Sequence, residues 1–235
     1  QTTVVLGNIA IDRRDPESNL TLAGRRLFSL LVSALTVALL TSGALAQTSV
    51  NRHEPLGPSS RKTSIVISEI MYKPAPRSDT NNLEYLEIYN SNPWFHDLSG
   101  YRIVANNMNY TFSPGTIIAS NAFLVIAASP GSLRNVYGIT NALGPYAGSL
   151  NNSNKSGTIQ LLDEVGAVVL SVPYSNVYPW PVAADGTGHS IVLGYPSYGE
   201  EDPRAWDVSD VVGGSPGQNE GYVSSLLRNV VINEF

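Results

Sequence analysis

The sequence predicts an all-β protein built as a sandwich of two sheets. About eight short runs of apolar and β-branched residues recur at regular spacing, each bounded by turn residues. Glycine (20) and proline (15) are abundant, whereas charged residues make up only 14% of the 235 residues. That mixture suits strands joined by turns and does not suit long helices. The chain contains no cysteine, so a hydrophobic core, and not disulfides, must hold the fold.

The N-terminal part of the chain predicts an export signal. Residues 1–24 show no clear periodicity and are expected to be an upstream, unstructured extension. Residues 25–46 combine Arg25-Arg26, an uncharged apolar run and a small-residue cleavage site at Ala46, the features of a secretory signal peptide. A membrane anchor is a second reading, although the apolar run is shorter than the roughly 20 residues of a bilayer span, and a twin-arginine signal is a third. We expect export to the periplasm, the cell surface or the medium, with no stable membrane span after cleavage.

A polar segment and two strands follow. Residues 47–63 are rich in polar residues, Pro and Gly and predict a flexible linker. The domain itself is expected over residues 64–222. Its first strand is Ile65–Tyr72, stopped by Pro74, and its second is Glu84–Tyr89. In the second strand Glu84, Leu86 and Ile88 share one face, and Tyr85, Glu87 and Tyr89 the other. Neither face is wholly apolar, so the sequence leaves open which one is buried.

The middle of the domain predicts three more strands and one helical turn. Gly100–Val104 and Tyr110–Phe112 are short strand-like runs that end at turn residues. Ala122–Ala128 is the most continuous apolar run of the domain and predicts a strand buried on both faces. Leu133–Tyr137 could form a single helical turn.

The last third predicts a hairpin, a final strand and a long tail. Thr158–Asp163 and Ala167–Tyr174 flank the turn Glu164-Val165-Gly166, and His189–Leu193 is the last strand. The tail Tyr195–Gly221 is rich in Gly, Pro and acidic residues and predicts a loop that closes over the domain and then links onward. Residues 223–235 are expected to be a linker and the first strand of a second copy, because Val231–Phe235 repeats the pattern of Val66–Ile70.

Several motifs share one family pattern. Its first half carries Ile67-Ser68-Glu69-Ile70, Glu84-Tyr85-Leu86-Glu87-Ile88-Tyr89-Asn90 and Asp97-Leu98-Ser99-Gly100-Tyr101, and its second half carries Tyr178-Pro179-Trp180-Pro181 and Gly214-Ser215-Pro216-Gly217. These motifs resemble the lamin tail domain family, from about Ser64 to Asn219, and the later ones its bacterial branch. The resemblance implies an immunoglobulin-like β-sandwich. It also implies export, tandem copies and neighbouring kinase domains similar to spore-coat protein H, although no kinase residues are present here.

The charge of the domain bears on its partners. From Ser64 onward the chain carries 15 acidic residues against 7 basic ones. In lamins this domain is associated with DNA, chromatin and protein partners, but an acidic surface repels a phosphate backbone. We therefore do not expect nucleic-acid binding.

The sequence offers no convincing catalytic or metal site. His189 and Ser190 are neighbours on a strand and would point to opposite faces, and the second Gly of a nucleophile elbow is missing. The histidines show no ligand spacing. The acidic stretch Glu200–Asp202, with Asp207 and Asp210, could gather Ca²⁺ ligands, but its spacing is not that of an EF-hand. We expect no cofactor, no metal and no catalytic residue.

Three glutamates of the strand motifs could suggest paired carboxylates for acid–base chemistry. Glu84 and Glu87 are three positions apart on one strand and should face opposite sides. We expect these two residues and Glu69 to be structural, either paired with Arg102 or exposed to solvent.

Exposed aromatic residues are the best candidates for contact with a partner. Trp94, Trp180 and Trp206 are expected in loops, with Tyr178 beside Trp180. They could bind a protein or stack on sugar rings. For Trp180 and Trp206, which lie at positions that resemble family motifs, we favour a role in capping the open ends of the sandwich, whereas Trp94 is more open to a partner.

The sequence therefore predicts a non-catalytic binding or structural module of an exported multidomain surface protein. Its expected partner is a protein or another cell-surface component, and a glycan is also possible. An accessory domain of a surface enzyme and a carbohydrate-binding module are compatible with the same sequence features.

Overall fold

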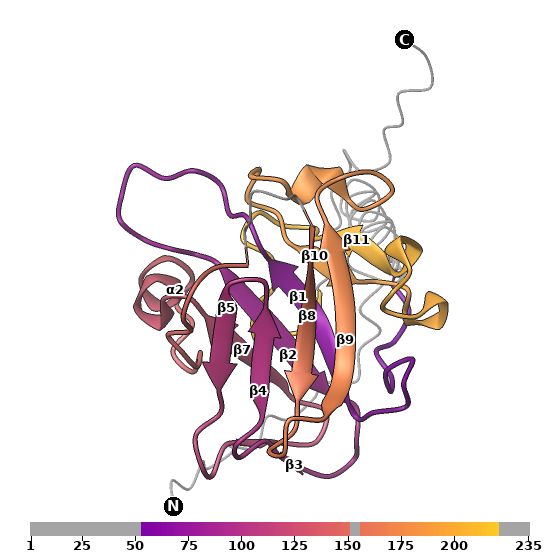
Figure 1. The fold of residues 1–235 in the computed structure, drawn as a ribbon. Coiled ribbons are helices and arrows are strands. Elements are labelled where there is room, and N and C mark those ends of the chain that lie inside the picture. The colour runs from indigo at the N-terminus through magenta and orange to yellow at the C-terminus, as the bar shows by residue number, and fades with distance from the viewer. Residues whose placement is uncertain (1–52, 151–155, 221–235) are drawn as a thin grey trace, which may run out of the picture. The chain divides into compact units, whose positions relative to one another are not determined.

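The computed structural model describes residues 53–150 and 156–220 (Figure 1). The chain divides into the units Gln1–Thr48 and Ser49–Phe235, and all described residues belong to the second. The expected signal peptide at 25–46, the extension before it and the expected second copy at 223–235 lie outside the described residues. Within the described ranges, no helix has the length and apolar character needed to cross a membrane.

The described residues form antiparallel sheets, as the all-β prediction requires. Sheet A contains, in order, β11 (Trp206–Val208), β10 (Ile191–Leu193), β1 (Ile65–Met71), β2 (Tyr85–Asn90) and β7 (Phe123–Ala127). Sheet B pairs β3 (His96–Asp97) with β6 (Ile117–Ile118). Sheet C contains, in order, β5 (Met108–Thr111), β4 (Arg102–Ala105), β8 (Ser156–Leu162) and β9 (Val168–Ser175). The predicted sandwich is confirmed.

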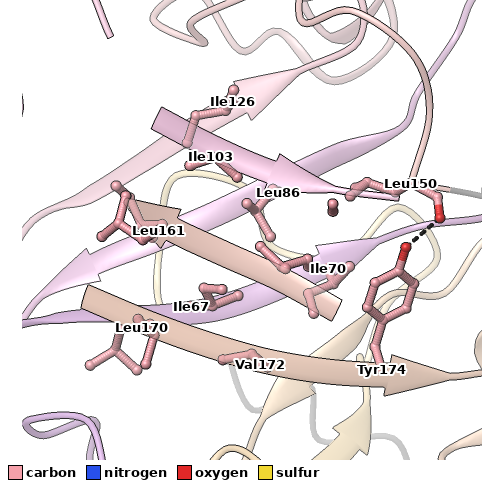
Figure 2. Close-up of a cluster of buried hydrophobic side chains, with 14 of the residues drawn as sticks. Ile67, Ile70, Leu86, Ile103, Ile126, Leu150, Leu161, Leu170, Val172 and Tyr174 are labelled. Atoms are coloured by element: carbon pink, nitrogen blue, oxygen red, sulfur yellow. Dashed lines mark hydrogen bonds between the residues drawn. The ribbon is translucent and has the colours of Figure 1, made fainter. Parts of the chain in front are cut away.

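The core lies between sheets A and C. Figure 2 shows side chains of β1 and β2, such as Ile67 and Leu86, facing those of β4, β8 and β9. Ile67, Ile70 and Leu86 are almost completely buried, and burial of each such side chain contributes roughly 1.5–3 kcal/mol. The hydroxyl of Tyr174 on β9 donates a hydrogen bond to the carbonyl of Leu150, which satisfies that buried polar group at the edge of the core.

The expected helical turn is a complete short helix. Helix α2 covers Pro130–Tyr137, a longer element than the predicted Leu133–Tyr137. Ser129 caps its N-terminus by accepting from the Ser132 N–H, and Pro130 occupies the first turn. Gly138, with φ of 74°, ends it in the left-handed conformation. The prediction is too short because the signal of this helix lies in the two caps and not in an apolar period.

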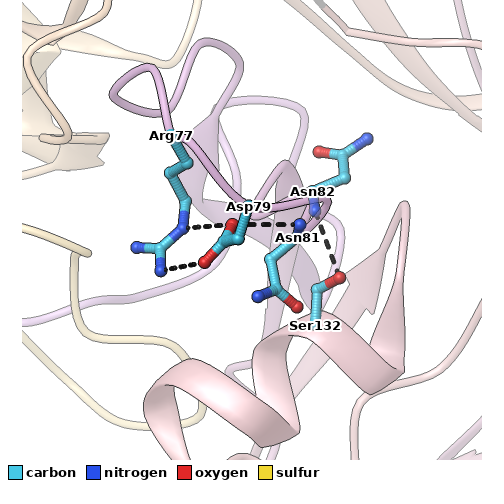
Figure 3. A network of polar contacts seen from close by, with 5 residues as sticks. All are labelled: Arg77, Asp79, Asn81, Asn82 and Ser132. Carbon is cyan, nitrogen blue, oxygen red and sulfur yellow. Dashed lines mark hydrogen bonds and ion pairs between the residues drawn. The ribbon is translucent and has the colours of Figure 1, made fainter.

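Helix α2 covers part of the outer face of sheet A, the face turned away from sheet C. Leu133 packs there in a second apolar cluster with Met71, Tyr85 and Val125. The loop before β2 is fastened to the helix, because the Asn82 N–H donates to the Ser132 hydroxyl at 3.1 Å (Figure 3). Within the same loop Arg77 forms a two-pronged ion pair with Asp79, which keeps the loop compact.

Three short strands are additional to the prediction, and the predicted linker is partly wrong. Strands β3, β6 and β11 contain only two or three residues each, too few to show an alternating pattern. Residues 53–63 are not a free linker: the Glu54 N–H donates to the Gly194 carbonyl at 2.8 Å, and the Ser60 N–H donates to the Glu200 carboxylate at 2.9 Å. Leu56 packs against the core in this segment, and that apolar contact holds it in place.

Three short 3₁₀ helices complete the described elements: Val182–Ala184, Pro196–Tyr198 and Pro203–Ala205. All lie in the last third of the chain, where the sequence predicts irregular connections. The predicted hairpin is confirmed as β8 and β9, which pair over most of their length. The predicted strands 100–104, 110–112 and 189–193 are present with shifted ends, as β4, β5 and β10.

Candidate functional site

An exposed apolar surface lies beside sheet B. It consists of Trp94, Phe95 and Ile117, with exposed fractions of 62%, 63% and 54%, and is called here the Trp94 surface. Phe95 directly precedes β3, and β3 and β6 pair so that Asp97 is opposite Ile117. Large apolar side chains that remain exposed on a short sheet are typical of contact sites.

The turn that carries Trp94 is held in place by a buried asparagine side chain. The side chain of Asn90, at the end of β2, is completely buried. Its amide nitrogen donates to the Trp94 carbonyl at 2.8 Å and to the Ala119 carbonyl at 3.0 Å. Its oxygen accepts from the Asn92 N–H at 3.0 Å. The Trp94 surface is therefore presented by a pre-organised turn, which lowers the entropy cost of binding.

Tyr178 and Trp180 form a second exposed turn. Tyr178 is 86% exposed, and its neighbours Val177 and Val182 are about half exposed. Trp180 is partly buried against the core, and its ring lies 6.3 Å from that of Trp206. The turn offers one aromatic ring to solvent and uses the other for packing.

Trp206 does not lie in a loop and is not available to a partner. It begins β11, where it pairs with Leu193 of β10, and only 4% of it is exposed. Its indole N–H donates to the Glu200 carbonyl at 2.9 Å. Of the two roles considered for Trp206, contact with a partner is therefore wrong, whereas packing against the sandwich agrees with its burial. The tail folds back as an edge strand and places the ring inside the fold.

Glu69 and Glu87 are neither paired with Arg102 nor exposed. They are opposite each other on β1 and β2, on the outer face of sheet A, and each is 1% exposed. Glu69 accepts from the hydroxyls of Tyr85, at 2.6 Å, and Ser190. Glu87 accepts from the Ser68 hydroxyl at 2.7 Å. The prediction is wrong here because the cover over this face comes from a distant part of the chain.

That cover is the segment 211–220, called here the strap. The Ser215 N–H donates to Glu69 at 3.1 Å, and the Gly217 N–H donates to Glu87 at 2.6 Å. The Tyr85 hydroxyl also donates to the Gly213 carbonyl at 3.1 Å. The two carboxyl groups are thus the acceptors that fasten the strap to the sheet, and burial beneath it removes them from water.

Burial controls the protonation of this pair. Desolvation raises the pKa of Glu69 to about 7, although the hydroxyls of Ser190 and Tyr85 oppose the rise. Desolvation, together with the charge of Glu69, raises the pKa of Glu87 well above its ordinary value. Two carboxyl groups that share a buried site resist simultaneous ionisation.

Glu84 serves a separate structural purpose. It accepts from the Tyr146 and Ser149 hydroxyls at 2.7 Å each, and from the Leu150 N–H. Because Glu87 binds the strap and Glu84 binds the 146–150 segment, the predicted opposite orientation of the two side chains is confirmed. Glu84 fixes a loop and is not part of an acid–base pair.

The remaining candidates for chemistry have structural partners. The Ser190 hydroxyl points to Glu69, whereas His189 Nδ1 contacts the Ser209 carbonyl at 2.9 Å. Glu200 is buried and accepts from the Ser60 N–H. Asp202 pairs with Arg204 at 2.6 Å. Among the described residues, no group of three or more His, Asp or Glu is arranged to hold a metal ion.

Comparison with protein families gives one match. The model of the Lamin Tail Domain family matches residues 58–176, about half of the chain. The matched region contains β1 to β9 and the Trp94 surface, whereas the Tyr178 turn and the strap lie beyond it. No curated protein matches the chain.

Proposed function

Since the chain belongs to the lamin tail domain family, a family of non-enzymatic immunoglobulin-like domains, we propose that it is a binding or structural module of an exported multidomain surface protein. In this role it mediates contacts with another protein or with the cell surface. The Trp94 surface carries the proposal: it exposes Trp94 and Phe95 on a turn that buried Asn90 holds in one conformation, with Ile117 exposed on the adjacent strand β6. Aromatic side chains in such settings supply much of the energy of protein–protein contacts.

Two features of the sequence support the proposed export and the proposed class of partner. The export signal expected at residues 25–46 motivates placing the module outside the cytoplasm. The acidic balance of the domain, with 15 acidic against 7 basic residues from Ser64 onward, motivates a partner that is not a nucleic acid. The same features suit an accessory domain of a surface enzyme.

The test is binding to separated cell-envelope fractions. The full chain, its Trp94→Ala/Phe95→Ala variant and a Val165→Ala variant are compared on immobilised envelope protein and envelope polysaccharide. Val165 is the matched control, because it is 83% exposed on the β8–β9 turn. We expect binding to the protein fraction that the double variant loses by at least about tenfold and that the control retains. Equal binding by all three chains would refute the proposal.

A carbohydrate-binding module is the second candidate, and Tyr178 is the observation that favours it. Its ring is 86% exposed, and an exposed aromatic face can stack on a sugar ring. Retention on the polysaccharide fraction that Tyr178→Ala abolishes, with the Trp94 surface variant unaffected, would favour the glycan over the protein partner.

A further inference from the structure

The strap has a conformation that only glycine permits at its start. Gly213 and Gly214 have φ of 100° and 72°, in the left-handed region where residues with a Cβ are strained. A Cβ on Gly213 would lie 2.7 Å from the ring of Tyr137 on α2. A Cβ on Gly214 would overlap Glu69 Oε1 and the Tyr85 hydroxyl. The backbone of the strap therefore lies directly on the carboxyl group beneath it.

Carboxyl groups provide most of the polar anchors of the strap. Glu69 and Glu87 bind the N–H groups of Ser215 and Gly217. Inside the strap, Glu220 accepts from the Ser215 hydroxyl at 2.8 Å and from the Asp210 N–H. A third carboxyl group is thus brought close to the first two whenever the strap is closed, and its charge opposes the ionisation of Glu69 and of Glu87.

The space beneath the strap is almost filled. A cavity of about 20 Å³ remains, room for about one water molecule. Ser68, Glu69 and Glu87 line it from the sheet, Ser215 and Glu220 from the strap, and His53 and Glu54 from the entering chain. Charges that form here can be hydrated by no more than about one water molecule unless the strap moves.

The titratable surroundings offer little compensation. From β2 the neighbours are Tyr85 and Glu87, and from α2 it is Tyr137, whose pKa is raised mainly by burial. His189, just before β10, is turned to Ser209, and His53 lies 3.5 Å from Asp207 of β11. No lysine or arginine is among the described residues that line the cavity. Ionisation of the pair would therefore place negative charges together with no lysine or arginine among the described residues that line the cavity.

We propose that the strap is a proton-controlled latch: it is held on the outer face of sheet A while Glu69 and Glu87 carry protons, and it loosens as they ionise. Opening would hydrate both carboxyl groups and separate them from Glu220. The latch does not depend on which partner the Trp94 surface binds, so the two proposals can fail separately.

The direction of the effect follows from linkage. In the open strap the carboxyl groups approach the ordinary pKa of glutamate, about 4.3, whereas in the closed strap the pKa of Glu69 is about 7. Between these two values the open state binds fewer protons than the closed state. The opening equilibrium constant should rise by about tenfold per pH unit for each linked proton, and Glu69 contributes no further change above pH 7. The strap is tightest in mild acid.

The experiment is NMR on the isotope-labelled full chain. The carboxyl ¹³C shifts of the glutamates are followed from pH 4 to pH 9, together with the solvent exchange of the Ser215 and Gly217 amides, corrected for intrinsic exchange. We expect two glutamates to titrate well above 4.5, and the protection of both amides to fall between pH 5 and pH 7 by about a hundredfold for each of the two linked protons. Ordinary titration of every glutamate, or protection that does not change with pH, would overturn the proposal.

Two variants separate the latch from general instability. Glu87→Gln keeps the shape and the acceptor oxygen of the protonated residue but cannot ionise, so only the Glu69 proton remains linked to opening. The fall in Gly217 protection between pH 5 and pH 7 should then shrink to about a hundredfold, the share of one proton. Glu164→Gln, on the exposed β8–β9 turn, is the matched control and should behave as the native chain. If Glu87→Gln does not fold, the carboxyl titration of the native chain still decides the question. A Glu87→Gln protein that is folded and shows an unchanged pH profile would contradict the proposal.

Discussion

Replacing Gly214 by alanine should cost much more stability than its backbone angles alone require. Gly214 has φ of 72°, and alanine in this region is strained by about 1–2 kcal/mol. The added methyl group would also overlap Glu69 Oε1 and the Tyr85 hydroxyl, both of which are buried and hydrogen-bonded. Relief requires the strap to lift, which breaks the Ser215–Glu69 hydrogen bond of 3.1 Å and costs about 1–3 kcal/mol for buried groups left unsatisfied. We expect a total loss of about 2–5 kcal/mol.

The assay is urea denaturation of the full chain, with tryptophan fluorescence reporting on the partly buried Trp180 and the buried Trp206. Gly115→Ala is the matched control, because Gly115 has φ of 80° but nothing lies within 4 Å of a Cβ placed there. The control should lose only the strain, about 1–2 kcal/mol. Equal losses in the two variants would refute the argument that strap contact, and not backbone strain, makes Gly214 necessary.

The remaining predictions concern the buried carboxyl groups, the Trp94 turn and the environments of Trp206 and Tyr178. Because the folded pKa of Glu69 is raised to about 7, its contribution to stability is complete below pH 4.5 and is lost as the pH rises to 7. The free energy of unfolding should fall by about 3 kcal/mol over this window. Urea denaturation midpoints that do not change with pH would contradict this. Asn90→Ala removes a buried side chain that bonds four backbone groups and should cost about 2–4 kcal/mol, with faster amide exchange around Trp94 as the specific sign. Trp206→Phe loses the hydrogen bond to the Glu200 carbonyl at 2.9 Å and should lower the midpoint of thermal unfolding. Tyr178→Ala, at a position 86% exposed, should leave that midpoint nearly unchanged. A larger loss of thermal stability for Tyr178→Ala than for Trp206→Phe would contradict the burial of these side chains.

The sheets were predictable from the sequence because the signal for each is local. Ala122–Ala128 shows a continuous apolar run, and the predicted strand appears as β7 within those limits. The hairpin of β8 and β9 is similarly encoded by its turn residues. Strands β3 and β6 could not be found this way, since a strand of two residues has no period and forms only when the rest of the fold brings its partner near.

The carboxyl pair could not be predicted because its environment comes from far along the chain. Glu69 and Glu87 lie on strands in which neither face is wholly apolar, and such a pattern is typical of an exposed face. Their cover comes from Ser215 and Gly217, more than a hundred residues away in sequence. The available signal was the glycine-rich run Gly213-Gly214-Ser215-Pro216-Gly217, whose positive φ angles and free N–H groups suit an approach to buried acceptors. Tyr178 shows the opposite case, since exposure on a turn followed directly from its polar and Pro-rich neighbours.

The entering segment and the strap line one and the same cavity: His53 and Glu54 come from the first, and Ser215 and Glu220 from the second. The segments through which the chain enters and leaves the described domain are therefore attached at adjacent points. A pull applied through these two segments would load their hydrogen bonds one after another, by peeling, and would leave the pairing of β1 with β2 unloaded until both segments had come away. Under tension such a module would lengthen in an early, low-force step, and only a larger force would unfold the sandwich.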